Sequence, residues 1–445
     1  MQRDINQLLL EWKDDPRRRP ILLRGARQVG KSYTVRSFAK KHFSNIVEID
    51  FELQPQMMSC FTTLEPKEIN DKISILTQKD ICHGETLLFF DEIQQCPMAM
   101  KALRYYYEKM PQLHVIAAGS LLEFLLHTEK IEVPVGRIQY LYMKPLSFAE
   151  FCEATGESRL RKMIAEAESL KEIGVAVHKH ALTVLKKYLV IGGMPNVVNE
   201  YIASENLRRC QQVQLSIIQT YRDDFGKYAS MVKHKYLQAI FSSVPKMVGR
   251  KFKYSQVDNE FTSRELKNAI ELLERAGVVQ RVYATNGDGL PLGAGVRERH
   301  FKAIFLDVGL MQNMCGYQGD IINAQDILSI HNGAVAEQFV GQELLAYHDP
   351  YRQPALYYWM REAKNSSAEV DYLTEWGSHV VPIEVKSGPG GKLKSLKLFM
   401  EKFQTLKGIA VSQRQFECLK NLTFLPLYGL NLLTQSNNNL QAFEH

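Results

Sequence analysis

The 445-residue sequence has no run of about 18 apolar residues, so it offers no candidate for a membrane-spanning helix. Its N-terminal stretch lacks the apolar segment and the small-residue cleavage site of a signal peptide. Cysteine is sparse: the seven residues are scattered and never spaced as CxxC, which argues against a zinc site and a disulfide framework. We therefore expect a cytoplasmic protein with reduced thiols and no membrane partner.

An excess of charge is also lacking, since 55 Lys and Arg residues nearly balance 49 Asp and Glu residues. Between Asp224 and Asp258, however, no acidic residue occurs, although the segment holds Lys227, Lys233, Lys235, Lys246, Arg250, Lys251 and Lys253. Its aromatic residues are Tyr228, Tyr236, Phe252 and Tyr254. Basic and aromatic residues together suit a nucleic-acid surface, through phosphate contacts and base stacking. A solvated helix face with aromatic residues in the core would give the same pattern.

The most specific motif is a glycine-rich loop near the N-terminus. A short apolar run at residues 20–23 leads into it, and a helical pattern follows to Phe38. This is GxxxxGK[ST] between a strand and a helix, where backbone N–H groups cradle phosphates at the positive end of the helix. Lys31 would reach the β- and γ-phosphates, and Ser32 would offer a hydroxyl to Mg²⁺. The expected nucleotide-binding residues are Gly25, Ala26, Arg27, Gln28, Val29, Gly30, Lys31, Ser32 and Tyr33.

An apolar run at residues 86–90 predicts a buried parallel strand, and Asp91 and Glu92 follow it. Carboxylates at the C-terminal end of such a strand emerge at the sheet edge where ligands bind. We expect Asp91 to hold Mg²⁺ through its water shell and Glu92 to orient or deprotonate the attacking water. The alternative is a solvated acidic pair at a strand end.

Two further residues have weaker signals. Ser120 ends a third apolar strand at residues 114–118, where its hydroxyl would sense the γ-phosphate or cap the helix expected after it. Arg137 follows a short extended stretch, and its guanidinium suits the developing charge of a γ-phosphate. As an ordinary surface arginine it would have no such role.

Several strings together resemble one family of prokaryotic ATPases, which carry an AAA-type module (AAA_14) and a C-terminal DUF4143 domain. They are the loop at 23–32, residues 90–94, Gly119-Ser120, Gly136-Arg137, residues 144–151 and the Tyr188…Gly192-Gly193-Met194-Pro195 string of the family's lid. The resemblance covers essentially the whole chain. It implies ATP as the nucleotide, with Mg²⁺.

Residues 158–189 and 196–225 have the composition of helices, and they fit a helical lid over the nucleotide. Further on, Thr262 and Glu265 form a capping box, Gly277 ends the helix, and a strand pattern follows at 278–283. This order is typical of a winged helix-turn-helix, in which Arg264, Lys267 and Asn268 would contact DNA. Many winged helices instead bind proteins or only connect domains.

The C-terminal third predicts a strand at 302–310, a helix from 333, and strands at 355–359, 369–373 and 379–386. Asp371 with Glu384-Val385-Lys386 resembles the D…ExK core of PD-(D/E)xK nucleases. Glu384 and Lys386 are two apart on a strand, so they share a face. Glu337, Asp371 and Glu384 would bind Mg²⁺, and Lys386 would position or activate water. A structural ion pair between Glu384 and Lys386 is the alternative.

The sequence thus predicts an α/β protein in three parts. Residues 1–225 form a P-loop NTPase domain of the AAA+ type with a helical lid, 226–285 a winged-helix-like connector, and 286–445 a nuclease-like DUF4143 domain with the restriction-endonuclease fold. The predicted function is an ATPase coupled to a domain that binds or cleaves DNA or another nucleic acid. The alternative is a nucleotide-switched interaction module whose nuclease-like domain is inactive. An oligomer is possible, with Arg137 acting in cis or in trans.

Overall fold

The computed structural model describes residues 1–120, 136–228, 231–317, 333–363, 366–386 and 393–433. Within these ranges, no helix has both the length and the apolar character needed to cross a membrane. The seven cysteines are all unpaired thiols, and four of them are buried.

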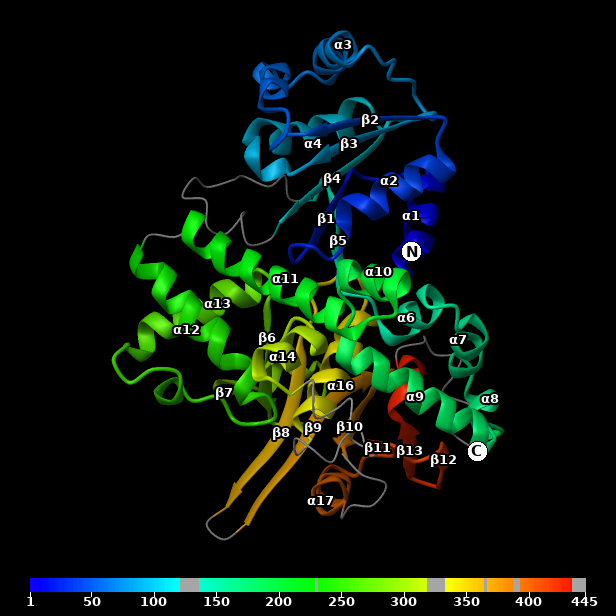
Figure 1. The fold of residues 1–445 in the computed structure, drawn as a ribbon, viewed down its shortest axis with the longest axis vertical. Helices are drawn as coiled ribbons and strands as arrows, with labels where there is room; N and C mark the ends of the chain where they lie inside the picture. Colours follow the sequence, from blue (N-terminus) through cyan, green and yellow to red (C-terminus); the bar gives the residue numbers. More distant parts are fainter. Residues whose placement is uncertain (121–135, 229–230, 318–332, 364–365, 387–392, 434–445) are drawn as a thin grey trace.

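The N-terminal unit is built on a parallel five-stranded sheet in the order β2-β3-β4-β1-β5 (Figure 1). Its strands are β1 (Ile21–Gly25), β2 (Asn45–Asp50), β3 (Thr86–Asp91), β4 (His114–Ser120) and β5 (Gln139–Met143). Its helices are α1 (Ile5–Asp14), α2 (Lys31–His42), α3 (Pro66–Thr77) and α4 (Pro97–Lys109). The strands predicted at 20–23, 86–90 and 114–118 are confirmed as β1, β3 and β4.

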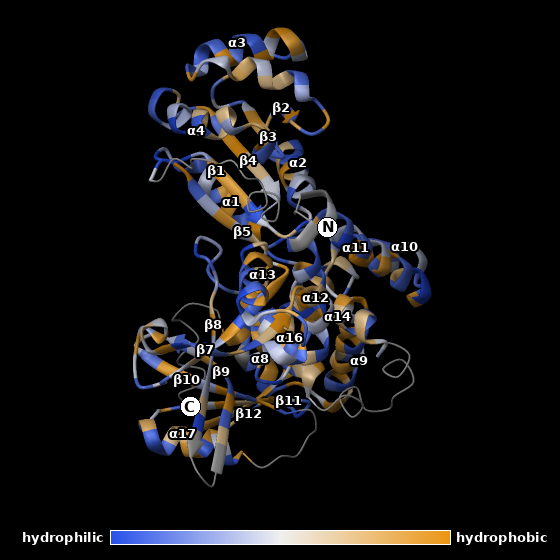
Figure 2. Cartoon of the chain, turned by 90° about the vertical axis from the view of Figure 1, so that its left-hand side faces the viewer, coloured by the Kyte–Doolittle hydropathy of each residue, from blue (hydrophilic) through white to orange (hydrophobic). Residues whose placement is uncertain are grey.

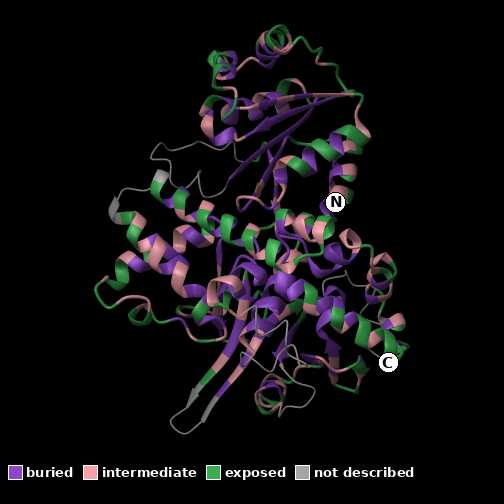
Figure 3. Ribbon diagram, in the orientation of Figure 1, coloured by how far each residue is buried: buried purple, intermediate pink, exposed green. Residues whose placement is uncertain are grey.

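Both faces of this sheet are covered, so its central strands are apolar throughout. Every residue of β3 and β4 is buried, and Figures 2 and 3 show them as orange and purple arrows. A parallel strand with helices on both sides needs such a continuous apolar run. That is why the runs at 86–90 and 114–118 identify strands that period-two alternation would miss.

The chain then forms a layer of helices below the sheet. They are α6 (Phe148–Ala154), α7 (Ser158–Ile164), α8 (Ala167–Lys171), α9 (Val175–Ile191), α10 (Pro195–Ser204), α11 (Leu207–Tyr228), α12 (Met231–Met247) and α13 (Ser263–Arg275). The capping box of Thr262 and Glu265 is present at the start of α13. Helix α9 ends at Ile191 with Gly192 as its C-cap, and α10 begins at Pro195, as the glycine–proline break predicts.

The C-terminal part is a mixed eight-stranded sheet in the order β12-β13-β11-β10-β9-β8-β6-β7. Its strands are β6 (Val279–Thr285), β7 (Val296–Phe305), β8 (Leu356–Ala363), β9 (Ser366–Trp376), β10 (His379–Val385), β11 (Gly408–Ser412), β12 (Glu417–Cys418) and β13 (Leu422–Pro426). Among the described residues, the helices that accompany it are α14 (Val308–Cys315), α16 (Ala334–Ala346) and α17 (Lys394–Phe403).

The strand predicted at 302–310 is wrong in its second half. Strand β7 ends at Phe305 and α14 begins at Val308, because Asp307 caps the new helix by accepting a hydrogen bond from the Leu310 N–H at 3.0 Å. The predicted domain boundaries also fall within continuous structure. The first lies inside α11, and the second separates β6 from β7, which pair in one sheet.

A polar seam on α16 joins the C-terminal sheet to the helical layer. Its three buried side chains are Gln338, Gln342 and Glu343. Gln338 exchanges two hydrogen bonds with the backbone of Phe305, at 2.8 and 2.7 Å. Gln342 accepts from the Val308 N–H at 2.7 Å and donates to the Tyr188 hydroxyl at 2.8 Å. Glu343 accepts from the Phe148 N–H, the first residue of α6, at 3.0 and 3.1 Å.

A second contact fixes the turn between α9 and α10. The Asp307 carboxylate accepts a hydrogen bond from the Gly193 N–H at 2.6 Å. Gly192 has a φ of +78°, and a Cβ atom there would lie 2.1 Å from the Asp307 carboxylate. Glycine is therefore required at this turn, because no side chain would fit between it and the acid.

The seam makes stability depend on pH through Glu343. Burial raises the pKa of Glu343 to about 8. The folded chain therefore holds this proton more tightly than the unfolded chain, and Glu343 lowers the free energy of unfolding as pH rises from about 4.5 to about 8. We predict that Glu343→Gln, which cannot ionise, gains on the order of a few kcal/mol relative to wild type over that range.

Urea unfolding of both proteins at pH 5 and pH 8 measures this difference. Glu401→Gln, at an exposed position on α17, is the matched control and should follow wild type. A difference between wild type and Glu343→Gln that stays constant, or changes in the opposite direction, would show that Glu343 is ionised in the folded protein.

Candidate functional site

Three strands of the N-terminal sheet end at one edge and bring the predicted ATP-site residues together. Gly25 at the end of β1 lies in register with Ser120 at the end of β4. Asp91 ends β3, the strand on the other side of β4. Because these strands are parallel, their C-terminal ends share this edge, where α/β sheets bind ligands.

The loop from Gly25 to Ser32 has the conformation expected of a phosphate cradle. Gly30 has a φ of +93° and precedes α2, and Gln28 has a φ of +66°. Lys31 is buried, and its ammonium donates to the carbonyls of Gly25 and Ala26 at 3.2 and 3.0 Å. The lysine thus lies folded over the loop whose N–H groups would face phosphate.

Ser32 and Asp91 meet as hard oxygen donors. The Ser32 side chain hydrogen-bonds the Asp91 carboxylate, which is buried, and burial is the main cause that raises the pKa of Asp91. A hydroxyl beside a carboxylate is the donor set that Mg²⁺ prefers, so these two residues fit the metal. The Arg36 guanidinium lies 3.6 Å from the same carboxylate, and no motif marks it in the sequence.

Glu92 has an unusual backbone. Its φ and ψ of 49° and 45° are left-handed, which costs a non-glycine residue about 1–3 kcal/mol. Its carboxylate accepts a hydrogen bond from the Gln94 amide at 2.6 Å. Strained residues of this kind are concentrated at functional sites, where the strain fixes a side-chain direction.

Ser120 is buried at the same edge, and its hydroxyl has no hydrogen-bond partner among the described residues. A buried hydroxyl without a partner is costly, and a phosphate oxygen would satisfy it. The residues that it would cap, from 121 onward, lie outside the described part of the chain.

Arg137 lies apart from this group. It precedes β5, whose first residue, Gln139, is in register with Ile21 at the start of β1. It is therefore near the opposite edge of the sheet, a strand length of roughly 16 Å away. Its guanidinium pairs with Glu108 at 2.9 Å and thereby lowers the pKa of that carboxyl. Within one chain Arg137 does not join the P-loop, so the alternatives that stay open are a role in trans and an ordinary surface arginine paired with Glu108.

The P-loop is held from two sides by residues that no local motif reveals. Arg27 forms an ion pair with Asp224 of α11 at 3.1 Å, and the Tyr221 hydroxyl donates to the Arg27 carbonyl at 2.7 Å. On the other side, Arg3 donates to the Val29 carbonyl at 3.0 Å and pairs with Glu150 of α6 at 2.9 Å. The partners are some 26 to 197 positions apart in the sequence, so only the fold brings them together.

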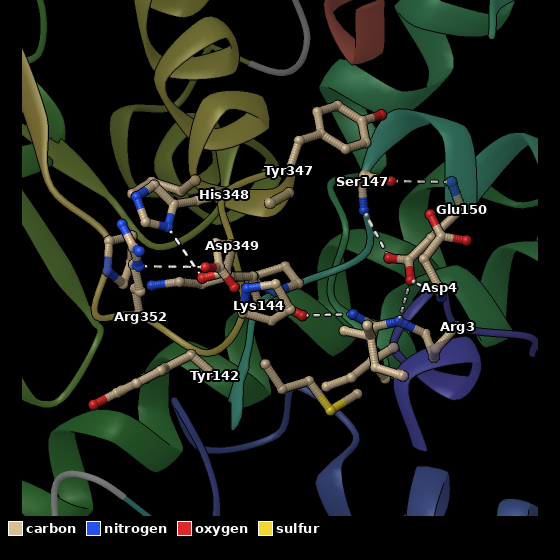
Figure 4. Close-up of a pocket in the computed structure, with 18 residues that line it drawn as sticks. Arg3, Asp4, Tyr142, Lys144, Ser147, Glu150, Tyr347, His348, Asp349 and Arg352 are labelled. Carbon is tan, nitrogen blue, oxygen red and sulfur yellow. Dashed lines mark hydrogen bonds and ion pairs between the residues drawn. The ribbon is translucent and has the colours of Figure 1, made fainter. Parts of the chain in front are cut away.

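Two cavities border these contacts. One, of about 160 Å³, adjoins the P-loop at Gln28 and Gly30 and extends to Asn196 and Asn199 of α10. The other, of about 230 Å³, lies between the N-terminal segment, the end of β5 and residues 345–354 (Figure 4). Arg3 lines both. In Figure 4 it lies between Glu150 and the carbonyl of Lys144, to which it donates at 2.7 Å.

The acid-free segment divides into exposed charges and packed aromatics. Lys233, Lys235, Lys246, Arg250 and Lys253 are exposed, as are Arg264, Lys267 and Asn268 of α13, whereas the side chains of Lys227 and Tyr228 are outside the described part. Phe252 is buried and stacks on Phe301, and Tyr236 packs on Phe261 and donates to Glu265 at 2.5 Å. Phe252 and Tyr236 belong to internal packing, so base stacking by these two residues is not supported.

The predicted nuclease-like residues also come together, but around a lysine. Lys302 of β7 is 3.1 Å from Glu337 and 3.4 Å from Asp371, and it contacts Glu369. Its side chain is only 4% exposed. Burial alone would lower the pKa of Lys302, but the three carboxylates raise it well above its ordinary value. Neither Lys302 nor Glu369 is among the residues that the sequence predicts for this site.

Glu384 and Lys386 form the ion pair that was the structural alternative, with Lys386 donating to Glu384 at 2.6 Å. The second oxygen of Glu384 is buried and has no partner among the described residues. Asp371 accepts from the Val385 N–H at 2.8 Å, which joins β9 to β10. Burial and the Asp371 carboxylate raise the pKa of Glu384 to about 7.

In this arrangement the cluster does not fit a divalent metal. Three carboxylates converge on an ammonium instead. Across the described ranges no group of three or more His, Cys, Asp or Glu side chains is placed to hold a metal ion. The residues of the predicted ATP site thus fit Mg²⁺, and those of the predicted nuclease-like site do not.

Models of three protein families match the chain in succession. An AAA domain matches residues 17–152, a domain of unknown function (DUF8612) matches 182–320, and a domain of unknown function (DUF4143) matches 332–428. No curated protein matches.

Several solved structures are similar to the chain at low sequence identity. The Walker-type ATPase of Pyrococcus abyssi is 16% identical over 71% of this chain and 95% of its own, with a TM-score of 0.44. The RuvB Holliday junction branch migration motor of Thermotoga maritima is 16% identical over 63% and 90%, with a TM-score of 0.29. Drosophila ORC bound to DNA is 12% identical over 70% and 85%, with a TM-score of 0.26.

The geometry predicts which arginine and lysine variants bind nucleotide. Lys31→Ala removes the ammonium at the centre of the loop, and we expect ATP affinity to fall by about 100-fold, or about 3 kcal/mol. Arg137→Ala, at the far edge of the sheet, should bind ATP like wild type. Titration with a fluorescent ATP analogue measures both, and equal affinity of Lys31→Ala and wild type would place the nucleotide elsewhere.

Proposed function

Because the chain carries an AAA domain ahead of a DUF4143 domain, we propose that it is a Mg²⁺-dependent ATPase whose nucleotide state controls its C-terminal domain. The observation that carries the proposal is the convergence of Lys31, Ser32, Asp91, Glu92 and Ser120 at one sheet edge. Each has the chemistry that phosphoryl transfer to water requires.

In this proposal the loop N–H groups and Lys31 hold the β- and γ-phosphates, so that the ammonium leaves the carbonyls of Gly25 and Ala26 for phosphate oxygens. Ser32 and Asp91 would hold Mg²⁺, which neutralises phosphate charge when bound. Glu92 orients or deprotonates the attacking water, and its bond from Gln94 fixes its direction. The Ser120 hydroxyl, which is buried and has no partner within the described ranges, contacts the γ-phosphate.

A continuous series of contacts supports control of the C-terminal domain. Arg3 joins the P-loop carbonyl of Val29 to Glu150 of α6. The first N–H of α6 donates to Glu343 of α16. At the other end of α16, about 9 Å away at 1.5 Å per residue, Glu337 contacts Lys302. A change at the loop therefore has a polar route to the carboxylate cluster.

A second route passes through the lid. Pro195 lies against Gly30, since a Cβ atom added to that glycine would be 3.3 Å from the proline ring. Two residues earlier, the Gly193 N–H donates to Asp307 at the start of α14. Movement of the lid over bound ATP would thus act on the C-terminal domain directly.

For the C-terminal domain both forms of the proposal have support. Exposed basic residues of the acid-free segment and of α13 favour binding to DNA or another nucleic acid. The ion-paired Lys302 and Lys386 favour the form in which the nuclease-like domain is an interaction module without cleavage activity.

The catalytic part of the proposal predicts separate effects on binding and hydrolysis. Glu92→Gln keeps the size and the hydrogen bond of the side chain but removes the base, so hydrolysis should fall by roughly 100-fold or more while ATP still binds. Steady-state phosphate release and nucleotide titration on the same preparation measure the two quantities.

Ser120→Ala is the companion variant, and we expect it to lower the rate of hydrolysis without abolishing ATP binding. Glu108→Gln, beside Arg137 at the far edge of the sheet, is the control. Undiminished hydrolysis by Glu92→Gln would exclude this residue as the base and leave the ATP-binding part of the proposal standing.

A further inference from the structure

Lys302 contacts the carboxylates of a cluster whose sequence pattern predicts a metal. Glu337 comes from α16, Glu369 and Asp371 from β9, and Lys302 from β7, which is separated from β9 by β6 and β8 in the sheet. The lysine therefore contacts carboxylates that lie on α16 and on a strand that is not its neighbour in the sheet. Three of its neighbours are acidic, and an ammonium has three N–H donors.

The distances favour an ammonium and not a divalent ion. Lys302 lies 3.1 Å from the Glu337 oxygen and 3.4 Å from the Asp371 oxygen, in the range of charged hydrogen bonds and ion pairs. Mg²⁺ requires oxygen atoms at about 2.0–2.1 Å in a nearly octahedral arrangement. Both cations cannot occupy the same position, because the ammonium already fills it.

The cluster still contains what a metal would need once the ammonium is removed. Glu337, Glu369 and Asp371 would lose their shared counter-ion, and three buried or half-buried carboxylates without one are costly. Glu384 adds a buried oxygen that has no partner among the described residues. The four acids together form a hard-oxygen donor set.

We propose that Lys302 is an internal cation that takes the place of the divalent metal in this nuclease-like site. It fastens α16 to the sheet through Glu337, Glu369 and Asp371, and it keeps the cluster from acting as a metal-dependent hydrolase. The cluster thereby holds the start of α16, the helix that contacts α6, in a fixed position on the sheet. This inference rests on the form of the proposed function in which the C-terminal domain is an interaction module.

The test is the binding of Mn²⁺ to the full chain without nucleotide. Electron paramagnetic resonance measures the free Mn²⁺ that remains, and the melting temperature measures the effect of Mn²⁺ on stability. Wild type should not bind Mn²⁺ at this cluster, so Glu337→Gln should leave the Mn²⁺ binding of wild type unchanged. Lys302→Met keeps the length of the side chain without the charge, and we expect it to bind Mn²⁺ more tightly than wild type by roughly ten-fold or more. Its melting temperature should rise with Mn²⁺.

Three further variants serve as controls. Lys302→Arg retains the cation and should behave as wild type. Lys386→Met removes the other lysine, which is bonded to Glu384 alone among the carboxylates of the cluster, and should gain little Mn²⁺ affinity. The double variant Lys302→Met/Glu337→Gln should lose the affinity that Lys302→Met gains.

The inference is overturned if wild type binds Mn²⁺ at Glu337 as tightly as Lys302→Met does. It is equally overturned if Lys302→Met binds no Mn²⁺ when folded, or stays unfolded in Mn²⁺. Cleavage of DNA by wild type that Glu384→Gln abolishes would also overturn it. None of these outcomes concerns the ATPase, whose failure would appear separately as absent phosphate release from wild type.

Discussion

The arrangement of the two halves of the chain depends on one constraint: the buried polar side chains of α16 must all find partners. Gln338, Gln342 and Glu343 are nearly excluded from water, and each meets a partner on a different element. A buried polar group without a partner costs about 1–3 kcal/mol, whereas each satisfied bond contributes only about 1 kcal/mol. The seam therefore acts mainly by raising the free energy of any other placement of α16, in which these side chains would lose their partners. It thereby determines where Tyr188 and α6 lie relative to the C-terminal sheet.

The sequence predicts the N-terminal sheet and its ATP site well because the chemistry there is local. A phosphate cradle needs Gly30 at a positive φ, a lysine after it and a hydroxyl next, and these residues are consecutive. The apolar runs before Asp91 and Ser120 likewise identify buried parallel strands without any knowledge of the rest of the chain. Arg137 shows the limit of this reasoning. Its residue type suits a γ-phosphate. However, the strand that follows it runs toward the sheet edge with the predicted nucleotide site, so Arg137 lies near the opposite edge.

What the sequence does not predict are contacts between distant residues. Lys302 lies in a strand pattern that gives no sign of Glu337 or Asp371, because it meets them only once the sheet has formed, with β6 and β8 lying between β7 and β9. Arg3 likewise reaches Val29 and Glu150 from an unremarkable N-terminal segment. Asp307 is mispredicted for another reason. Its apolar neighbours continue the pattern of a strand, but its own carboxylate ends that strand by capping α14. Lys302 and Arg3 are thus missed because their partners are distant in the sequence, whereas Asp307 is missed because a cap to Leu310, three residues on, overrides the strand pattern around it.

The same principle explains why polar contacts, and not more apolar packing, occupy the junction between the ATP site and the cluster. One continuous apolar core runs from α1 to the last described strands, and apolar packing tolerates small sliding movements because it has no direction. A hydrogen bond such as Gly193 to Asp307, or an ion pair such as Arg3 to Glu150, is either made or broken within a fraction of an ångström. A junction built from such contacts has discrete arrangements, and discrete arrangements are what a nucleotide must favour unequally to control a distant domain. These polar contacts thus hold the junction in one defined arrangement and can be exchanged for another when nucleotide binds.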